Sequence, residues 1–167
     1  MGRCVTAAPD RRSTDWRTMD LQEISDRFGI ADTLHRYSRA VDTKDWELWR
    51  SVFTPEAVVD YSSTPFGQAG TRDEIAAWLE ESFAFVSVSQ HFITNIEYTF
   101  DHDGTGDRAD VRAMFYNPMR FVGMPELSTC GGNYHHTMVR TPDGWKSSGL
   151  VEECLWFENS PAGTEGS

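Results

Sequence analysis

Helical patterns fill the first half of this chain and strand patterns fill the second half. From Leu21 to about Asp42, apolar side chains recur at helical spacing, which predicts a long amphipathic helix. A second, short helix follows from Trp46, and Pro55 is expected to mark its end. A third helix is expected after a capping box that begins at Thr71.

The strand patterns that follow are joined by short turns. The four longer ones cover residues 87–100, 108–121, 131–141 and 145–157, and a short one precedes them at residues 57–61. Because these strands do not alternate with helices, their order predicts an α+β fold with a mostly antiparallel sheet. A curved sheet folded over the long first helix would leave a pocket between helix and sheet.

Composition narrows the classes of partner. The formal net charge is -11 and no Lys/Arg-rich run is present, so nucleic acid is an unfavourable partner. No apolar run approaches the roughly 18 residues of a membrane span, so no membrane partner is expected. The three cysteines are spaced neither for metal binding nor as C-x-x-C, which predicts reduced thiols and a cytoplasmic location.

The chain is expected to form one folded domain between two flexible ends. Residues 1–18 are polar and lack the continuous apolar stretch of a secretory signal, so they are expected to be a flexible extension. The folded domain is expected to cover residues 19–159, followed by a flexible tail at residues 160–167.

His91 is the main candidate for a catalytic residue. It stands in an extended stretch, whereas Asp42 closes the first helical pattern about fifty positions earlier. If the two side chains meet across the pocket, they form a general base and the carboxylate that orients it, with no metal or cofactor. A lone strand histidine is more often structural, however, and Asp42 could equally belong to a turn or helix cap.

Four blocks of sequence carry a family pattern. They cover residues 37–46 with 53–57, residues 70–75, residues 90–95, and residues 131–136 continuing through 139–146 to Glu153. In this order they resemble the SnoaL-like branch of the NTF2-like superfamily, over about residues 20–159. The resemblance implies an α+β cone that encloses a pocket. The family contains dehydratases, a dehydrochlorinase, polyketide cyclases and isomerases, together with non-enzymatic binding and assembly domains.

The resemblance also implies roles for particular residues. In eliminating members, the catalytic dyad occupies the positions of Asp42 and His91, and two pocket tyrosines match Tyr37 and Tyr61. Each tyrosine could instead be a core aromatic with a satisfied hydroxyl. The dehydrochlorinase carries an arginine shortly after its G-x-W block, whereas four uncharged residues, 147–150, follow here. The resemblance therefore favours loss of water or isomerisation over halide elimination.

Further pocket residues are expected from the resemblance, from strand parity and from side-chain size. The resemblance points Tyr134 inward, and alternation then places His136 and Cys130 on the same face, while Asn95 shares parity with His91. Large apolar candidates for the pocket wall are Trp46, Phe53, Trp78, Phe83 and Met114. Such a wall suits a flat hydrophobic substrate of steroid or aromatic polyketide size.

Two adjacent pairs of polar residues are expected to have no catalytic or metal-binding role. His135 and His136 should point to opposite faces of a strand, which disfavours a metal site. Glu152 and Glu153 are expected to be one packed and one exposed strand residue. No nucleotide-binding or nucleophile motif is found in the sequence.

The sequence thus favours a cofactor-independent lyase or isomerase that uses His–Asp acid–base catalysis on a small hydrophobic carbonyl compound. The alternatives are a polyketide-type cyclase with the same dyad, or a non-catalytic ligand-binding module or accessory subunit of a ring-hydroxylating oxygenase. The family resemblance further implies a homodimer or homotrimer packed through the outer face of the sheet.

Overall fold

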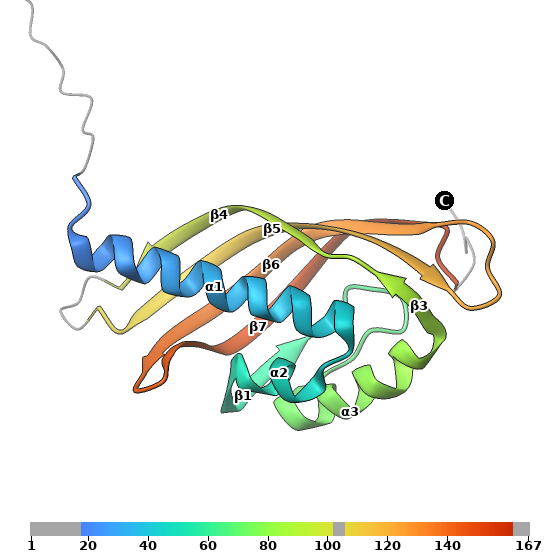
Figure 1. Cartoon of the computed structure of the whole chain (residues 1–167), viewed down its shortest axis with the longest axis horizontal. Coiled ribbons are helices and arrows are strands. Elements are labelled where there is room, and N and C mark those ends of the chain that lie inside the picture. The colour runs from blue at the N-terminus through green and yellow to red at the C-terminus, as the bar shows by residue number, and fades with distance from the viewer. Residues whose placement is uncertain (1–17, 102–105, 162–167) are drawn as a thin grey trace, which may run out of the picture.

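The structure, a computed structural model, describes residues 18–101 and 106–161 (Figure 1). The flexible extension and tail expected at the two ends therefore lie almost wholly outside the described residues. The described residues form the α+β fold that the sequence predicts, with helices packed on a curled sheet. Figure 1 shows α1 lying along one face of the sheet, with α2 and α3 gathered near the C-terminal end of α1.

Side-chain caps account for where the helices begin. Helix α1 spans Leu21–Thr43, and its N-cap Asp20 accepts a hydrogen bond from the backbone of Glu23. Helix α2 spans Trp46–Ser51 and begins after the N-cap Asp45. Helix α3 spans Arg72–Ser82 and follows the predicted capping box, in which Thr71 and Glu74 each bond the other's backbone. A short 3₁₀ turn, Phe83–Phe85, leads into the sheet.

The sheet has seven strands in one mixed arrangement. Their bounds are β1 Phe53–Asp60, β2 Ala69–Thr71, β3 Val86–Ser89, β4 Phe92–Phe100, β5 Arg108–Phe121, β6 Ser128–Thr141 and β7 Gly144–Glu158. The order is β2-β1-β7-β6-β5-β3, and β4 also pairs with β5. Only the β1–β7 pairing is parallel, so the expected mostly antiparallel sheet is confirmed among the described strands.

Two expected element boundaries were wrong. Helix α2 ends at Ser51, and Pro55 lies inside β1, at an irregularity in the pairing with β7. A strand tolerates proline at such a position because no ladder hydrogen bond from its nitrogen is required. The single strand expected at residues 87–100 is two strands, interrupted at Gln90 and His91.

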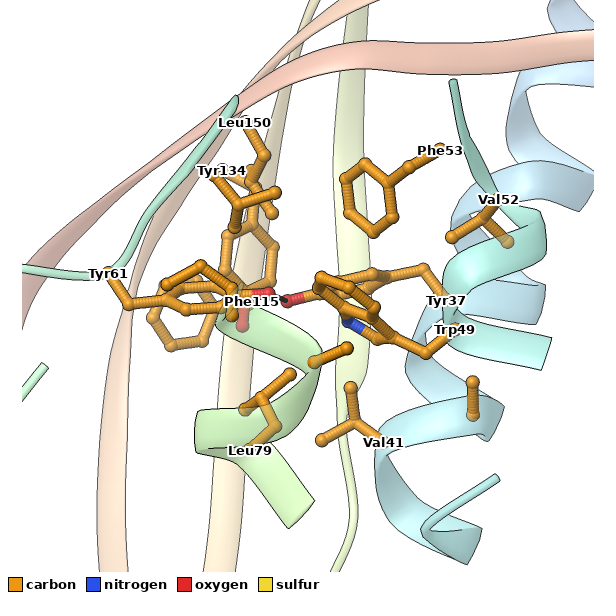
Figure 2. Packing of buried hydrophobic residues seen from close by; sticks show 14 of the residues in the cluster. Tyr37, Val41, Trp49, Val52, Phe53, Tyr61, Leu79, Phe115, Tyr134 and Leu150 are labelled. Atoms are coloured by element: carbon orange, nitrogen blue, oxygen red, sulfur yellow. Dashed lines mark hydrogen bonds between the residues drawn. The ribbon is translucent and has the colours of Figure 1, made fainter. Parts of the chain in front are cut away.

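Two buried clusters lie at opposite ends of α1. The N-terminal cluster contains Ile30, Leu34, Ala109, Val111, Ala113, Met138 and Trp145. The second cluster lies near the C-terminal end of α1, where its side chains surround a small cavity, and is named the cavity-end cluster. It is larger and more aromatic, and its members include Tyr37, Val41, Trp49, Phe53, Tyr61, Leu79, Phe115 and Tyr134 (Figure 2). The same helix thus covers two differently built regions of the sheet.

The outer face of the sheet exposes a row of aromatic side chains. Tyr116 contacts Phe92 on one side and Trp156 on the other, with ring centroids 6.1 and 5.9 Å apart. All three side chains are exposed in the single chain. The homodimer or homotrimer expected from this face stays a prediction, as does the cytoplasmic location.

None of the helices in the described part of the chain is both long enough and apolar enough to cross a membrane.

Candidate active site

His91 lies in the interruption between β3 and β4, which Pro118 on the neighbouring strand helps to explain. The pairings Ser89–Met119 and Phe92–Tyr116 flank the interruption in the same register. Gln90 N–H donates to the carbonyl of Pro118 at 3.1 Å, but proline has no N–H to return the bond. The ladder therefore stops at this point, and His91 is available for other contacts.

Asp42 holds both the backbone and the ring of His91. The backbone N–H of His91 donates to Asp42 Oδ2 at 2.8 Å, and Nδ1 of the ring lies 2.6 Å from Asp42 Oδ1. Ser89 Oγ donates to the same Oδ1 at 3.0 Å. The two residues that the sequence predicts as a dyad are therefore in direct contact.

The environment of Asp42 fixes the tautomer of His91. Burial opposes ionisation of Asp42, but the hydrogen bonds and charge of His91 and the bond from Ser89 lower the pKa of the carboxyl below its ordinary value. An ionised carboxylate only accepts hydrogen bonds, so the proton of neutral His91 lies on Nδ1. The lone pair then lies on Nε2, which is the arrangement that a general base requires.

Asn117 supports the dyad and is a residue that the sequence reasoning missed. It lies opposite His91 in the register of β5, and its side chain is buried. Its amide Nδ2 donates to the carbonyl of Gln90 at 3.2 Å and to Ser89 Oγ at 3.1 Å. The side chain thus supplies the donor that Pro118 lacks. An asparagine beside a proline opposite the Q-H block was the only available signal.

His91 faces a cavity of about 150 Å³ between the sheet and the helices. The wall is mainly apolar and includes Val41, Trp78, Leu79, Phe83, Phe115, Met119 and Phe157. The polar groups are His91 and Asn117, three tyrosines, Cys130 and Glu152, with Thr64 and Ser82. An apolar cavity with few polar groups is the usual form of a small-molecule site.

The three tyrosines of the cavity are buried and form one polar cluster. Tyr37 and Tyr61 share a hydrogen bond of 2.8 Å between their hydroxyls, and Figure 2 shows the two side chains pointing toward each other. The Tyr134 ring packs edge-on to Tyr37, 5.4 Å away, and stacks on Phe115. Burial raises the pKa of all three hydroxyls well above the ordinary value, so they are neutral hydrogen-bond donors at physiological pH.

Glu152 brings a carboxyl group into the same cavity. As expected, Glu152 is buried and Glu153 is exposed. Burial raises the pKa of Glu152 to about 8, and the negative charge of Asp60 adds to the increase while a hydrogen bond from Tyr134 opposes it. The sequence predicts only a packing role for Glu152, because strand parity does not reveal a cavity.

Several of the expected pocket residues do line the cavity, and others do not. Tyr37, Tyr61 and Tyr134 line it, together with Cys130, Trp78 and Phe83. Asn95 and Met114 were expected to face the pocket, but both side chains are exposed. Asn95 has a positive φ of 50° at a register shift in β4, which breaks the alternation from His91. On β5 the inward positions are Ala113, Phe115 and Asn117, so Met114 faces outward.

Three further expected residues are packed into the protein without lining the cavity. Phe53 is buried between Tyr37 and Trp49, and Trp46 packs against Phe83. His136 is buried on the same face as Tyr134, as parity predicts, and its Nδ1 lies 3.0 Å from Ser147 Oγ. Burial lowers the pKa of His136 to about 3, so it is neutral. Phe53 and His136 thus pack against the tyrosines from outside the cavity, and Trp46 packs against Phe83.

No group of three or more potential metal ligands occurs within residues 18–101 and 106–161. His135 is exposed and lies 3.3 Å from Glu153, whereas His136 is buried, so the two histidines do point to opposite faces.

Comparison with known proteins places the chain in a family. A model of the SnoaL-like domain matches residues 22–150, so the protein belongs to the SnoaL-like family, within the NTF2-like fold. An uncharacterized protein of Mycobacterium tuberculosis is 35% identical over 139 residues, which are 83% of this chain and 91% of that protein.

Solved structures with the same fold extend the comparison. A Novosphingobium aromaticivorans protein provisionally assigned as an aromatic ring hydroxylase is 30% identical, with a TM-score of 0.70 over 80% of this chain and 91% of that chain. The hexachlorocyclohexane dehydrochlorinase LinA-type3 from Novosphingobium barchaimii is 18% identical, with a TM-score of 0.69 over 83% and 92%. At that identity the second likeness shows the fold alone.

Proposed function

We propose that the protein is a cofactor-independent lyase or isomerase, with dehydration favoured, that acts on a small carbonyl compound. The observation that carries the proposal is that Asp42 binds both the backbone N–H and the ring Nδ1 of His91, beside a mainly apolar cavity. Here the backbone and Nδ1 are both fixed, so that Nε2 is presented as a base.

The proposed reaction begins with removal of a proton from the carbon next to the carbonyl. Nε2 of His91 takes the proton, and Asp42 stabilises the imidazolium that forms. The electron pair of the C–H bond becomes an enolate. Its oxygen accepts a hydrogen bond from the member of the Tyr37–Tyr61 pair whose hydroxyl hydrogen is not used in their mutual bond. A donor placed in this way is worth roughly 2.7–4 kcal/mol in the barrier.

The second step decides between elimination and isomerisation. For dehydration, the enolate re-forms the carbonyl, a carbon–carbon double bond forms, and the bond to a β-hydroxyl breaks. The imidazolium of His91 gives its proton to that hydroxyl, which leaves as water. For isomerisation, the imidazolium returns the proton to a different carbon. In both cases one histidine serves first as base and then as acid.

The charges at the cavity favour an oxygen leaving group over a halide. Among the described residues that line the cavity there is no lysine or arginine. For an anionic leaving group, the imidazolium of His91 would therefore be the only positive charge that the described cavity wall supplies. A hydroxyl that is protonated as it leaves needs no such charge.

The size of the cavity supports a smaller substrate than the steroid or polyketide size that the sequence suggests. Pockets for drug-sized ligands usually measure roughly 300–1,000 Å³. The cavity here measures about 150 Å³, which suits a single-ring compound better than a steroid.

Proton exchange in deuterated water tests the proposal even where the final product is not identified. A panel of single-ring ketones is incubated with the protein, and deuterium at the α and γ carbons is followed by NMR. We expect exchange with at least one ketone, and its loss in His91→Ala. The exposed residue His35 on α1 provides a matched control, and His35→Ala should keep the wild-type rate. Equal exchange in His91→Ala and wild type would refute the mechanism.

One comparison supports a second candidate function. The likeness at 30% identity to a provisionally assigned aromatic ring hydroxylase favours a role beside a ring-hydroxylating oxygenase, as a non-catalytic accessory subunit. Stable co-purification with an iron–sulfur oxygenase subunit, together with no proton exchange across the ketone panel, would support this role. A polyketide-type cyclase would share the dyad chemistry, and ring closure of a linear polyketone by the protein would identify it.

A further inference from the structure

Glu152 presents a carboxyl group that the fold itself does not use. It lies on β7, directly opposite Tyr134 of β6, and both side chains face the cavity. The residue is only 9% exposed. No hydrogen-bond partner for its buried Oε1 is found in the described ranges of the chain. A buried polar atom without a partner is unfavourable for folding, which calls for an explanation in function.

The neighbours of Glu152 do not provide the missing contact. Among the described residues, Tyr134 acts on the pKa of Glu152 through a hydrogen bond, while Tyr37 and Tyr61 bond each other. Cys130, on the same cavity wall, contributes a thiol that lies within reach of Asn117. Glu152 lines the cavity, so a ligand in the cavity is a partner that its carboxyl group can meet.

We propose that Glu152 donates a hydrogen bond to a second, uncharged acceptor oxygen of the ligand and so determines specificity for single-ring compounds with two oxygen functions. The role of the first oxygen, the carbonyl beside the carbon that His91 deprotonates, rests on the proposed function, but recognition at Glu152 does not. Glu152 here is a binding residue at the far side of the cavity, separate from the dyad.

The position of Glu152 across the sheet sets the distance between the second oxygen and the carbon that His91 deprotonates. His91 lies at the edge formed by β3 and β4, and β5 and β6 separate this edge from β7. Three strand spacings of about 4.8 Å amount to roughly 14 Å across the sheet. Glu152 is displaced further along the strands, because it pairs with Tyr134, whereas the register of His91 leads to Cys130. Side chains extend into the cavity from both sides of this span. A ring with oxygens at opposite positions fits between them better than one with adjacent oxygens.

The same site should reject anions. A carboxyl that is neutral at physiological pH can donate to a carbonyl or ether oxygen. A ligand carboxylate placed there would face Glu152 beside the negative charge of Asp60, with no cation among the described lining residues. The predicted substrate class is thus a neutral ring ketone that carries, besides any hydroxyl it eliminates, a second uncharged carbonyl or ether oxygen; charged ring acids are excluded.

Binding of three matched probes tests the proposal. The probes are cyclohexane-1,4-dione, 4-methylcyclohexanone and 4-oxocyclohexanecarboxylate, and dissociation constants are measured by NMR titration at about pH 7. We expect the dione to bind about tenfold more tightly than the methyl ketone, as one added hydrogen bond allows. The carboxylate should bind more weakly than either. Equal binding of all three probes would overturn the proposal.

Variants of Glu152, measured at two pH values, distinguish the effect of the carboxyl group on binding from the effect of the cavity shape. Glu152→Leu should remove the preference for the dione, whereas Glu152→Gln keeps an N–H donor and should retain it. At about pH 9.5 the wild type should lose the preference, because an ionised carboxylate cannot donate, while Glu152→Gln keeps it. If Glu152→Leu does not fold, the comparison of wild type with Glu152→Gln at the two pH values decides alone. Identical behaviour of these two proteins would refute the proposal.

The other titratable groups near Glu152 do not confound this pH range. They are Asp60 on β1, Tyr61 after β1, Tyr37 on α1, Tyr134 and Cys130 on β6, and Cys154 on β7. The pKa of Asp60 is lowered by the hydrogen bonds from Ser62, so it stays ionised. Burial raises the pKa of the three tyrosines and of Cys130 far enough that these groups stay neutral. Burial also raises the pKa of Cys154 above its ordinary value.

His91→Ala distinguishes this proposal from the proposed function. The variant should keep the preference for the dione over the methyl ketone, although it loses proton exchange. Loss of the preference in His91→Ala but not in Glu152→Leu would place recognition at the dyad and refute a role for Glu152. Failure of exchange with intact probe preference would instead refute only the proposed reaction.

Discussion

Two buried carboxyl groups, one at each of the two clusters along α1, differ in how many hydrogen-bond partners they have. Asp26, at the N-terminal end, is 5% exposed and Glu152, at the cavity, is 9% exposed. Asp26 accepts two bonds of 2.7 Å from Arg140, one of 3.1 Å from Trp145 Nε1 and one of 3.0 Å from Gln22. Glu152 Oε1 accepts none from the described residues. Similar burial therefore does not imply a similar role.

The partners decide the charge of each group. Burial opposes ionisation of Asp26, but the bonds from Arg140, Trp145 and Gln22 lower the pKa of its carboxyl below the ordinary value. Burial raises the pKa of Glu152 to about 8 because one tyrosine cannot compensate for it. Asp26 is thus a charged structural group, and Glu152 is a neutral group available to a ligand.

The packing of side chains also differs between the two ends of α1. The N-terminal cluster includes the small residues Ala109 and Ala113. At this end α1 lies close to the sheet at Gly29, since a Cβ there would lie 3.1 Å from Trp145 Cδ1. The cavity-end cluster contains more aromatic rings, and several of them line the cavity.

The largest effect is expected from Asp42→Asn. The amide can no longer accept both bonds from His91, so the tautomer with a free Nε2 is lost. Proton exchange with the active ketone should fall by about 10⁴-fold, as for an aspartate that orients a catalytic histidine. Asp45→Asn, at the exposed N-cap of α2, is the matched control and should leave the rate unchanged. A loss below about tenfold would show that Asp42 only anchors the chain.

Next in size is the pH dependence of stability caused by Glu152. The folded carboxyl keeps its proton up to about pH 8, whereas the unfolded one loses it near its ordinary value of 4.5. Between these values the unfolded state binds fewer protons, so stability falls as pH rises, by up to about 1.4 kcal/mol per pH unit. Glu152→Gln should remove this slope in urea unfolding. An unchanged slope would mean that Glu152 is ionised when folded.

Asp26→Ala should destabilise the protein without affecting exchange. It leaves Arg140 without its main partner, and breaking a fully buried pair typically costs about 3–5 kcal/mol. Since the Arg140 side chain is 31% exposed, the loss should be smaller, roughly 2–3 kcal/mol in urea unfolding. Exchange measured well below the unfolding transition should match the wild type. Reduced proton exchange in the folded variant would show that Asp26 also affects the reaction at the cavity.

The smallest effect concerns packing. Ala113→Val adds volume to the N-terminal cluster and should destabilise the protein by about 1–2 kcal/mol through overpacking. Cys130→Val adds volume beside the cavity and should change stability by less than about 1 kcal/mol, while it weakens binding of the dione. Similar destabilisation by both changes would indicate that the two ends are packed alike.

The sequence allowed much of this architecture to be predicted. The period of α1 and the capping box at Thr71 follow from local rules that tertiary structure did not override. The contact of Asp42 with His91 was also expected, since helix end and strand were placed by the family resemblance.

Features that depend on the pairing of distant strands could not be predicted. Asn117 supports the dyad only because β5 places it opposite His91, with Pro118 unable to donate. Asn95 faces outward because a bulge reverses the alternation of β4, and a bulge leaves no clear signal in one sequence. The sequence predicted one packed and one exposed residue at Glu152 and Glu153, but only the structure shows that Oε1 of Glu152 lacks a partner among the described residues.

The contrast between the two buried carboxyls can be measured in one sample. Carbon-13 NMR of selectively labelled aspartate and glutamate side chains follows both titrations, and Asp26→Asn and Glu152→Gln spectra assign the signals. We expect Asp26 to titrate below its ordinary value of 3.8 and Glu152 to titrate at about 8. Titration of Glu152 near 4.5 would contradict the account, because its carboxyl would then be charged when it meets the ligand.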